Sequence, residues 1–213
     1  MIKQNWKTLI VTSLIILLPI VAGLLLWDQL PDKVPMHWGP SGEVDGWGSK
    51  PFFVFGLPAI MLAFQWLCVL ATDADAKKKN HSTKMVALVL WIIPVIEIML
   101  AIITYMTALG YGVRVEIVIP AFMGLMLTVL GNYMPKCKQN YTIGIKLPWT
   151  LDNEENWNKT HRLAGWLWTI GGLLIAATSL TGIFWIPLVV FVPMTLIPVF
   201  YSYILFRKNS ENN

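Results

Sequence analysis

The chain alternates long apolar segments with short polar ones. A transmembrane helix needs about 20 predominantly apolar residues to cross the hydrocarbon core of a bilayer. Six segments have this character, and the polar cluster Ser179–Gly182 separates the last two: residues 8–27, 51–72, 85–109, 115–134, 163–180 and 183–206. The pattern predicts an all-α, polytopic membrane protein with six transmembrane helices, folded as a single domain over residues 1–213.

The composition supports this prediction. Of the 213 residues, 56% are hydrophobic and only 13% are charged, whereas a soluble domain carries about 25% charged residues. So few charges cannot cover the surface of a soluble globule, which argues against a soluble enzyme, a nucleic-acid-binding protein and a disordered chain. The net charge of +4 is too small to indicate direct contact with nucleic acid. We therefore expect the lipid bilayer to be the main surroundings of the chain.

The distribution of basic residues predicts the orientation. With six spans, 13 of the 16 Lys and Arg residues fall in the N-terminus, the second and fourth loops and the C-terminus. Because cytoplasmic loops carry the excess of basic residues, both termini are predicted to be cytoplasmic. Residues 28–50 then form an external loop and residues 135–162 a cytoplasmic one. The chain is expected in the plasma membrane, crossing it several times.

The external loop, residues 28–50, is rich in turn-forming residues. It contains three prolines and four glycines, which favour turns rather than a helix. One interpretation is an ordered cap on the helix ends, and the other is a recognition surface, because ordered loops on a rigid scaffold often carry binding. The candidate ligand-binding residues are His37, Trp38, Asp45 and Trp47.

The cytoplasmic loop, residues 135–162, combines basic and aromatic residues. A helix is predicted from Asp152, whose side chain suits an N-cap. Two interpretations remain equal: an interfacial segment that anchors the loop on anionic lipid, or a docking surface for a cytoplasmic protein. Trp157, His161 and Arg162 fall on one stripe of this helix. The candidate partner-binding residues are Lys146, Trp149, Trp157, His161 and Arg162.

Glu97 is the one carboxylate predicted well inside a span. A charge at the centre of a transmembrane helix costs about 2.5–3.5 kcal/mol on insertion scales, so this side chain must face the bundle interior, find a partner or be protonated. An intramembrane acid is a functional candidate by default. However, the spans contain no complementary Lys or Arg, so a structural or protonated Glu97 is an equal alternative.

Catalytic and metal-binding patterns are absent from the sequence. There is no Gly-rich phosphate loop, no H-E-x-x-H and no G-x-S-x-G motif. The three histidines, His37, His81 and His161, stand in separate segments, and no spacing suits a metal ion. We expect a protein without cofactor or metal that is not an enzyme.

Two motifs resemble one known family. The external loop contains Leu30, Pro31, Val34, Pro35, His37, Trp38, Gly42 and Asp45. The cytoplasmic loop contains Gly144-Ile145-Lys146-Leu147-Pro148-Trp149-Thr150, followed by Trp157 and Thr160-His161-Arg162. Both are similar to the SdpI family of bacterial toxin-immunity membrane proteins, the first to the short N-terminal domain that many of them carry. Two positions depart from the family pattern: Lys146 stands where arginine is expected, and Leu147 where threonine is common.

The resemblance implies an immunity protein that protects its cell from a secreted antimicrobial toxin. It also implies a possible second role, in which the toxin-bound protein is a receptor that holds a transcriptional autorepressor at the membrane. The external residues would then meet the toxin, the cytoplasmic ones the repressor, and Glu97 is a candidate coupling group between them. The rival interpretation is a small transporter or exporter of a peptide or ion that uses Glu97. A structural or assembly protein is a third.

Overall fold

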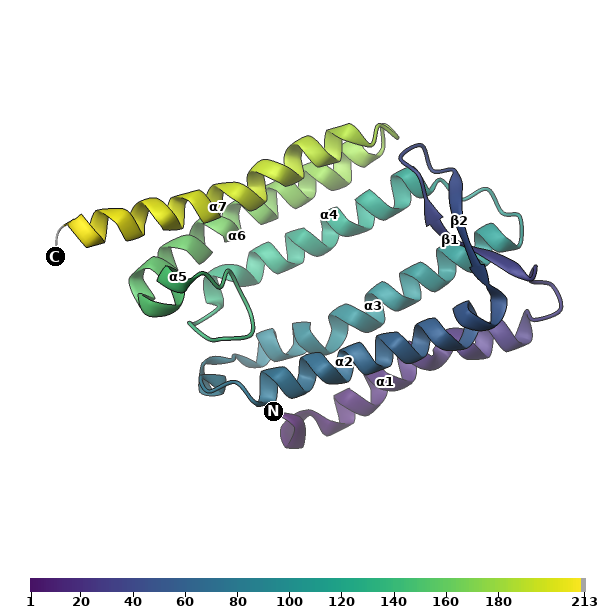
Figure 1. The fold of residues 1–213 in the computed structure, drawn as a ribbon, viewed down its shortest axis with the longest axis horizontal. Coiled ribbons are helices and arrows are strands. Elements are labelled where there is room, and N and C mark those ends of the chain that lie inside the picture. The colour runs from purple at the N-terminus through teal and green to yellow at the C-terminus, as the bar shows by residue number, and fades with distance from the viewer. Residues whose placement is uncertain (212–213) are drawn as a thin grey trace. The chain divides into compact units, whose positions relative to one another are not determined.

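The computed structural model describes residues 1–211, and helices dominate it (Figure 1). In chain order the elements are α1 (Ile2–Leu25), β1 (Lys33–Trp38), β2 (Val44–Ser49), η1 (Phe52–Gly56), α2 (Leu57–Asp73), η2 (Lys78–Asn80), α3 (Thr83–Ala108), α4 (Val115–Tyr133), η3 (Met134–Lys136), α5 (Pro148–Asp152), α6 (Glu154–Ser179) and α7 (Trp185–Glu211). η1 is a π-helical turn, and η2 and η3 are short 3₁₀ helices.

Within the described residues, five helical segments are long and apolar enough to cross a membrane: Ile2–Leu25, Phe52–Asp73, Thr83–Ala108, Val115–Lys136 and Trp185–Asn209. The predicted mostly α-helical, multi-pass membrane fold is therefore confirmed. The fifth predicted span, residues 163–180, corresponds to the later part of α6, which begins with the polar residues 154–162 and is uncharged only from Leu163 onward. The count of six spans and the cytoplasmic termini stay predictions.

The segment between α1 and α2 contains a β-hairpin, which the turn-rich sequence did not predict. β1 and β2 pair antiparallel, with Lys33 opposite Ser49 and Trp38 opposite Val44. The pairing shifts on either side of His37. Such bulges bend a strand and redirect its side chains. Pro35, Gly46 and Gly48 are thus accommodated inside short, irregular strands, whereas Gly39, Pro40 and Gly42 form the turn between them.

By its contacts the chain divides into two compact units, and the first comprises residues 1–73 and 86–115. Two apolar clusters stabilise this unit. One joins the hairpin to the helices through Leu30, Val34, Phe53, Val54, Ala101 and Tyr105. The other lies among Leu9, Val69, Val86 and Leu90. The first cluster joins the segment after α1, the hairpin and η1 to α3, and the second joins α1, α2 and α3. The elements of this unit are therefore held together at two places along the helices.

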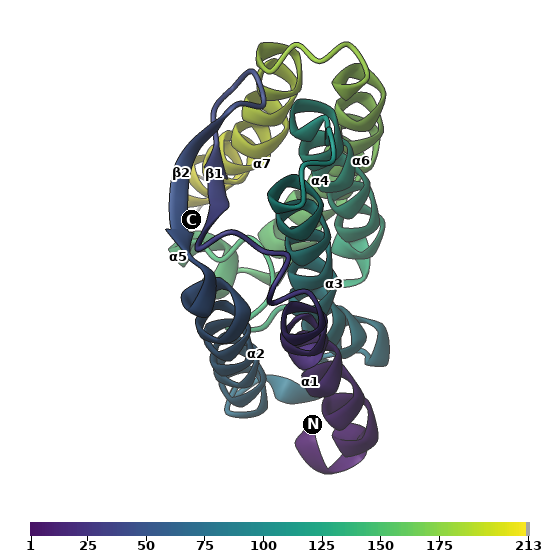
Figure 2. The same cartoon turned by 90° about the vertical axis from the view of Figure 1, so that its right-hand side faces the viewer.

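The second unit comprises residues 74–85 and, within the described chain, 116–211. Its helices α6 and α7 run side by side and are joined by a short turn (Figure 2). α4 and α6 approach closely at Gly124 and Gly172. A Cβ on Gly172 would lie 2.5 Å from the Gly124 carbonyl oxygen, and one on Gly124 would lie 2.6 Å from the Ala176 nitrogen. Small residues at such crossings are typical of membrane helices, whose packing depends on close backbone contact.

Candidate functional site

The hairpin brings His37 and Asp45 together. His37 Nδ1 lies 2.5 Å from Asp45 Oδ1, and the two side chains are 73% and 47% exposed. The register shifts lie on either side of His37, and Asp45 lies on the opposite strand between Val44 and Gly46, which pair with Trp38 and His37. The turn between the strands is closed by hydrogen bonds between Gly39 and the residues Gly42 and Glu43. The His37–Asp45 pair is therefore exposed, and a ligand can reach its hydrogen-bonding groups.

The other two predicted hairpin residues differ from each other. Trp47 is 58% exposed, whereas Trp38 is half-buried and its Nε1 has no hydrogen-bond partner among the described residues. Trp47 stands opposite Pro35 in the strand register. An exposed indole is unfavourable in water and is a frequent anchor in binding interfaces. The structure thus places three of the four predicted residues, His37, Asp45 and Trp47, on an accessible surface.

Lys50 anchors the base of the hairpin, a role that the sequence analysis missed. Its Nζ donates to the carbonyl oxygens of Trp27 at 3.1 Å and Leu30 at 2.9 Å, and lies 3.6 Å from Asp32 Oδ1. The ammonium also lies 4.9 Å from the Trp27 ring. Both carbonyls belong to the segment that follows α1, and a buried ammonium is stabilised by such acceptors because they replace its hydration. Lys50 therefore fixes the hairpin to the end of α1.

The connection between α4 and α6, residues 134–153, is organised by a buried asparagine. Asn140 Oδ1 accepts from the backbone nitrogens of Thr142 at 2.9 Å and Ile143 at 2.7 Å. Its Nδ2 donates to the carbonyl oxygens of Lys138 and Ile143, each at 2.9 Å. The Asn140 side chain thus bonds to the backbone before it, at Lys138, and after it, at Thr142 and Ile143. These bonds give the connection a defined structure.

The predicted stripe of Trp157 and His161 lies under this connection and not on the surface. Trp157 is fully buried, and its Nε1 donates to the Cys137 carbonyl oxygen at 2.7 Å. The two rings stack with centroids 4.0 Å apart. Gly144, at φ +122°, leaves the room that both rings need, because a Cβ there would collide with them. In this structure neither side chain is available to a partner.

His161 is held as one neutral tautomer. Its Nδ1 donates to the Trp157 carbonyl oxygen at 2.8 Å, and its Nε2 accepts from the Ile145 nitrogen at 3.0 Å. Burial lowers the pKa of His161 to about 4, although the hydrogen bond to the Trp157 carbonyl acts in the opposite direction. A proton on Nε2 would face the Ile145 N–H, so the imidazole here is a structural bridge between α6 and the loop.

The remaining predicted residues of this region reach the surface to different degrees. Lys146 and Arg162 are exposed, and Lys146 Nζ donates to the Thr142 carbonyl oxygen at 2.9 Å. Trp149 is half-buried: its Nε1 donates to Ser202 Oγ at 3.0 Å and its ring stacks on Phe206 of α7. The N-cap of α6 is Asn153, which accepts from the Asn156 nitrogen, rather than the predicted Asp152, which ends α5.

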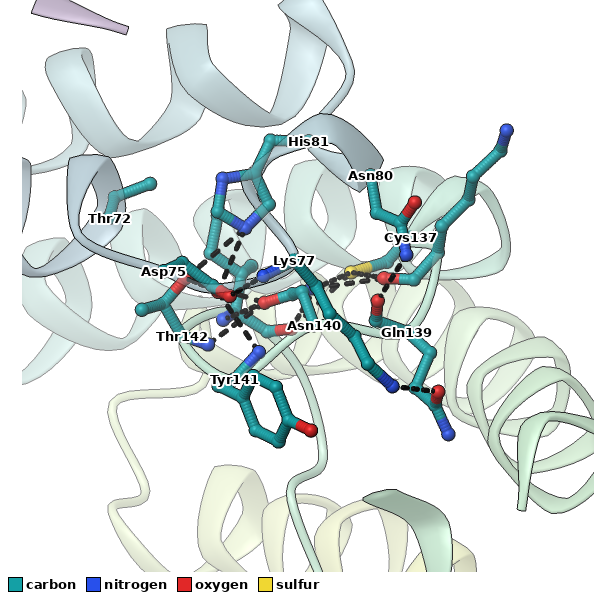
Figure 3. Close-up of polar contacts among 12 residues, drawn as sticks. Thr72, Asp75, Lys77, Asn80, His81, Cys137, Gln139, Asn140, Tyr141 and Thr142 are labelled. Atoms are coloured by element: carbon teal, nitrogen blue, oxygen red, sulfur yellow. Dashed lines mark hydrogen bonds and ion pairs between the residues drawn. The ribbon is translucent and has the colours of Figure 1, made fainter. Parts of the chain in front are cut away.

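A second buried cluster fixes the α2–α3 connection, residues 74–82, onto the same loop (Figure 3). Asp75 Oδ2 accepts from Thr142 Oγ1 at 2.8 Å and from the Tyr141 nitrogen at 2.9 Å. His81 Nε2 lies 3.2 Å from the same oxygen, and Asp75 Oδ1 accepts from the Lys77 nitrogen at 2.7 Å. The Asp75 and His81 side chains are almost completely buried.

Hydrogen bonding determines the charge state of Asp75. Burial acts to raise the pKa of its carboxyl, but the donors on Lys77, Thr142 and Tyr141, together with nearby His81, outweigh it and lower the pKa. Gln139 extends the cluster, because it accepts from Lys77 Nζ at 2.5 Å and its backbone oxygen accepts from Asn80 at 2.6 Å. The sequence analysis did not predict this cluster.

Glu97 lies in the middle of α3 and is 1% exposed. Its Oε2 has no hydrogen-bond partner within residues 1–211. Over the same part of the chain, no group of three or more His, Cys, Asp or Glu side chains is arranged to hold a metal ion. The geometry thus offers an exposed hairpin, a rigid polar loop and a buried acid on an apolar helix long enough to cross a membrane.

The chain is similar to known proteins in both of these regions. Residues 136–202 match the model of the SdpI/YfhL protein family, and residues 14–62 match that of a domain of unknown function (DUF1648). The chain is 29% identical over 176 residues to the Immunity protein SdpI of Bacillus subtilis (strain 168), which covers 81% of this chain and 82% of that protein. No solved structure shows significant similarity. The resemblance expected from the two motifs is confirmed, and the chain is a multi-pass protein of the plasma membrane.

Proposed function

Because the chain resembles the SdpI family in both of its motif regions, we propose that it is a membrane immunity protein that protects a cell from a secreted antimicrobial toxin. The observation that carries this proposal is the similarity to the Immunity protein SdpI, which extends over 81% of the chain and thus includes the helices as well as the loops. In this proposal the protein acts by binding, and the exposed residues of the hairpin offer contacts for a partner.

The hairpin is the proposed contact with the toxin. With the orientation predicted from the basic residues, it faces the exterior, where a secreted toxin arrives. Trp47 supplies an exposed apolar surface, and the His37–Asp45 pair of the same hairpin supplies a hydrogen-bond donor and acceptors. Lys50 and the buried Val34 hold this surface on the helix ends, so little ordering is needed when a ligand binds.

A survival assay tests the proposal. Toxin-sensitive cells that produce the full chain are expected to survive exposure to the toxin, and cells that produce Trp47→Ala to be killed. Trp6→Ala is the matched control, since Trp6 is 53% exposed on α1, far along the sequence from the hairpin. Both variants must reach the membrane in equal amounts. Killing of cells that hold the folded wild-type protein would overturn the immunity function, whereas full protection by Trp47→Ala would overturn only the role of the hairpin.

The second proposed role is that of a receptor that holds a transcriptional repressor at the cytoplasmic face. Its support is the exposed pair of cations, Lys146 and Arg162, which lies within the region matched by the SdpI/YfhL family model. The buried Trp157 and His161 then position the loop instead of touching the partner. A fluorescent fusion of the repressor should collect at the membrane of toxin-treated cells and stay in the cytosol with Lys146→Glu/Arg162→Glu. Equal membrane recruitment by this variant would contradict the role.

The rival function, transport of a peptide or ion, depends on Glu97 because that carboxyl is buried and has an unpartnered oxygen. Substitution Glu97→Gln separates the two functions. A transporter that moves its substrate or a coupled proton through Glu97 loses protection, whereas an immunity protein that binds the toxin at the hairpin keeps it. The same survival assay measures both outcomes.

A further inference from the structure

The second unit contains an apolar cavity of about 270 Å³ between α4, the end of α6 and the start of α7. Ile119, Met123 and Leu127 of α4 form one wall, and each lies about one helical turn from the next. Leu188 and Phe191, which have the same kind of spacing on α7, belong to the other wall. Because the lining residues recur at helical spacing on both helices, the cavity is a groove that runs along the helix axes.

α6 forms the floor of this groove through the buried Ile175. One turn earlier, α6 meets both neighbouring helices through adjacent glycines. A Cβ on Gly172 would lie 2.5 Å from the Gly124 carbonyl oxygen of α4, and one on Gly171 would lie 2.7 Å from Met194 Sδ of α7. Successive residues of a helix point about 100° apart, so α4 and α7 lie on two flanks of α6. The groove is the space between these flanks, one turn beyond the glycine contacts.

The lining of the groove is apolar throughout. Every described residue that lines it is Ile, Leu, Met, Phe or Pro. Sites for polar small molecules add a few hydrogen-bonding groups to an apolar lining, and these groups fix the orientation of the ligand. The side chains of this groove supply none, so a polar ligand would lose its hydration without compensation. The groove therefore suits a hydrocarbon.

The length of the groove matches one leaflet of a bilayer. The wall from Ile119 to Leu127 is about 12 Å long at 1.5 Å per residue, and half of the hydrocarbon core is about 15 Å thick. Trp185, next to the lining residue Phe184, is 63% exposed, and indoles favour the headgroup layer. Acyl chains extend across a leaflet in roughly the direction of the spanning helices. The groove thus has the direction, the length and the depth of an acyl chain.

We propose that this groove binds one acyl chain of a phospholipid, between α4 and α7 and on the floor formed by α6. Met123 and Leu188 of the two walls are exposed, so the groove is open to the lipid that surrounds these helices. With the orientation predicted from the basic residues, the lipid belongs to the outer leaflet. The chain stabilises the unit through dispersion contacts with three helices, in a space that otherwise lacks packing partners.

A photoreactive lipid tests the proposal. The full chain is placed in vesicles of phosphatidylethanolamine and phosphatidylglycerol that contain a little phosphatidylglycerol with a diazirine in the middle of one acyl chain. On illumination the diazirine loses dinitrogen, and the resulting carbene inserts into a neighbouring bond. Peptide mass spectrometry then maps the labelled residues.

Met123 and Leu188 are expected to carry at least fivefold more label than Leu125 and Val189. The latter two are exposed apolar residues at nearly the same depth that do not line the groove. A chain in the groove is surrounded by protein on three sides, whereas a chain on the outer surface mostly meets other lipids. Equal labelling of both pairs would mean ordinary boundary lipid only. Absence of label from the groove would mean another occupant, such as a second copy of the chain, and either result would overturn the proposal.

A filled groove provides the second measurement. Leu188→Trp places an indole in the groove and should lower the label on Met123 at least fivefold. Val189→Trp, the matched control one position away, should leave that label unchanged. Unchanged labelling of Leu125 verifies that both variants are folded in the vesicles. If Met123 is labelled equally in the two variants, the acyl chain does not lie in the groove. No toxin is needed, so failure here is separate from failure of the immunity function.

Discussion

The hairpin and the start of α6 beneath the α4–α6 connection each contain a tryptophan and a histidine, yet they use these residues in opposite ways. In the hairpin, His37 is 73% exposed and meets one carboxylate. Beneath the connection, His161 of α6 is 1% exposed, stacks on Trp157 and has both ring nitrogens occupied by the backbone. The first histidine is available to a ligand, while the second holds the chain in place.

The acid of the hairpin and the acid that contacts the α4–α6 connection differ in the same way. Asp45 is half-exposed beside His37, and an ion pair of this kind contributes about 0.2–1 kcal/mol. Asp75 is buried and accepts from three donors besides its contact with His81. The same residue types thus form an exposed surface in one region and a rigid support in the other. The comparison predicts that substitutions in the hairpin alter binding, whereas those in the connection alter stability.

The largest contrast is expected between two tryptophans. Trp157→Ala should lower the free energy of unfolding by about 3–5 kcal/mol, because it leaves a cavity and an unpaired Cys137 carbonyl. Trp47→Ala should change it by less than about 0.5 kcal/mol. Denaturant unfolding in detergent, followed by the remaining tryptophan fluorescence, measures both. Equal losses for the two variants would show that the hairpin is part of the structural core.

The next effect is a dependence of stability on pH. His161 has a pKa of about 4 in the folded protein, well below the value of about 6.5 for an unperturbed histidine. Above pH 6.5 both states are neutral and the stability is complete; as the pH falls from 6.5 towards 4, only the unfolded chain gains the proton, so stability is lost. The loss is on the order of 3 kcal/mol. Unfolding measured across this range should show a steeper decline for the wild-type protein than for His161→Gln, and parallel curves would contradict a neutral His161.

The apolar segments made the fold largely predictable from the sequence. A span is determined by its local composition, so the helix positions follow from the chain alone. The hairpin was not predicted because its short strands carry prolines and glycines, such as Pro35 and Gly46, whose usual role is in turns. Its exposed residues were identified all the same, since an aromatic such as Trp47 in a polar loop is visible without knowing the strand pairing.

The buried supports could not be predicted in this way. The stripe of Trp157 and His161 is apparent from helical spacing, but spacing does not tell whether a stripe faces a partner, the lipid or another part of the same chain. Asp75 and Thr142 are 67 positions apart in sequence, and their contact depends on how two loops meet in three dimensions. The composition of residues 135–162 and the resemblance to a family both pointed to this loop, but neither separated contact residues from supporting ones.

A smaller loss is expected from the buried acid. Asp75→Asn keeps the shape of the side chain but replaces one acceptor oxygen with a donor, which opposes the Thr142 and Tyr141 donors or the Lys77 nitrogen. We expect a loss of about 2 kcal/mol in unfolding free energy, the range for charge-assisted hydrogen bonds. Asp45→Asn is the matched control and should have little effect. A stable Asp75→Asn protein would mean that the α2–α3 connection is not held by this carboxylate.

The smallest effect should come from the exposed pair itself. A double-mutant cycle with His37→Ala, Asp45→Ala and both together should give a coupling free energy of unfolding below about 1 kcal/mol, because water screens the pair and its side chains must be ordered to meet. In the survival assay, each single variant should weaken protection more than its effect on stability explains. If the coupling in unfolding is large while protection is unchanged, the pair serves the hairpin fold, and the contrast between the two regions is lost.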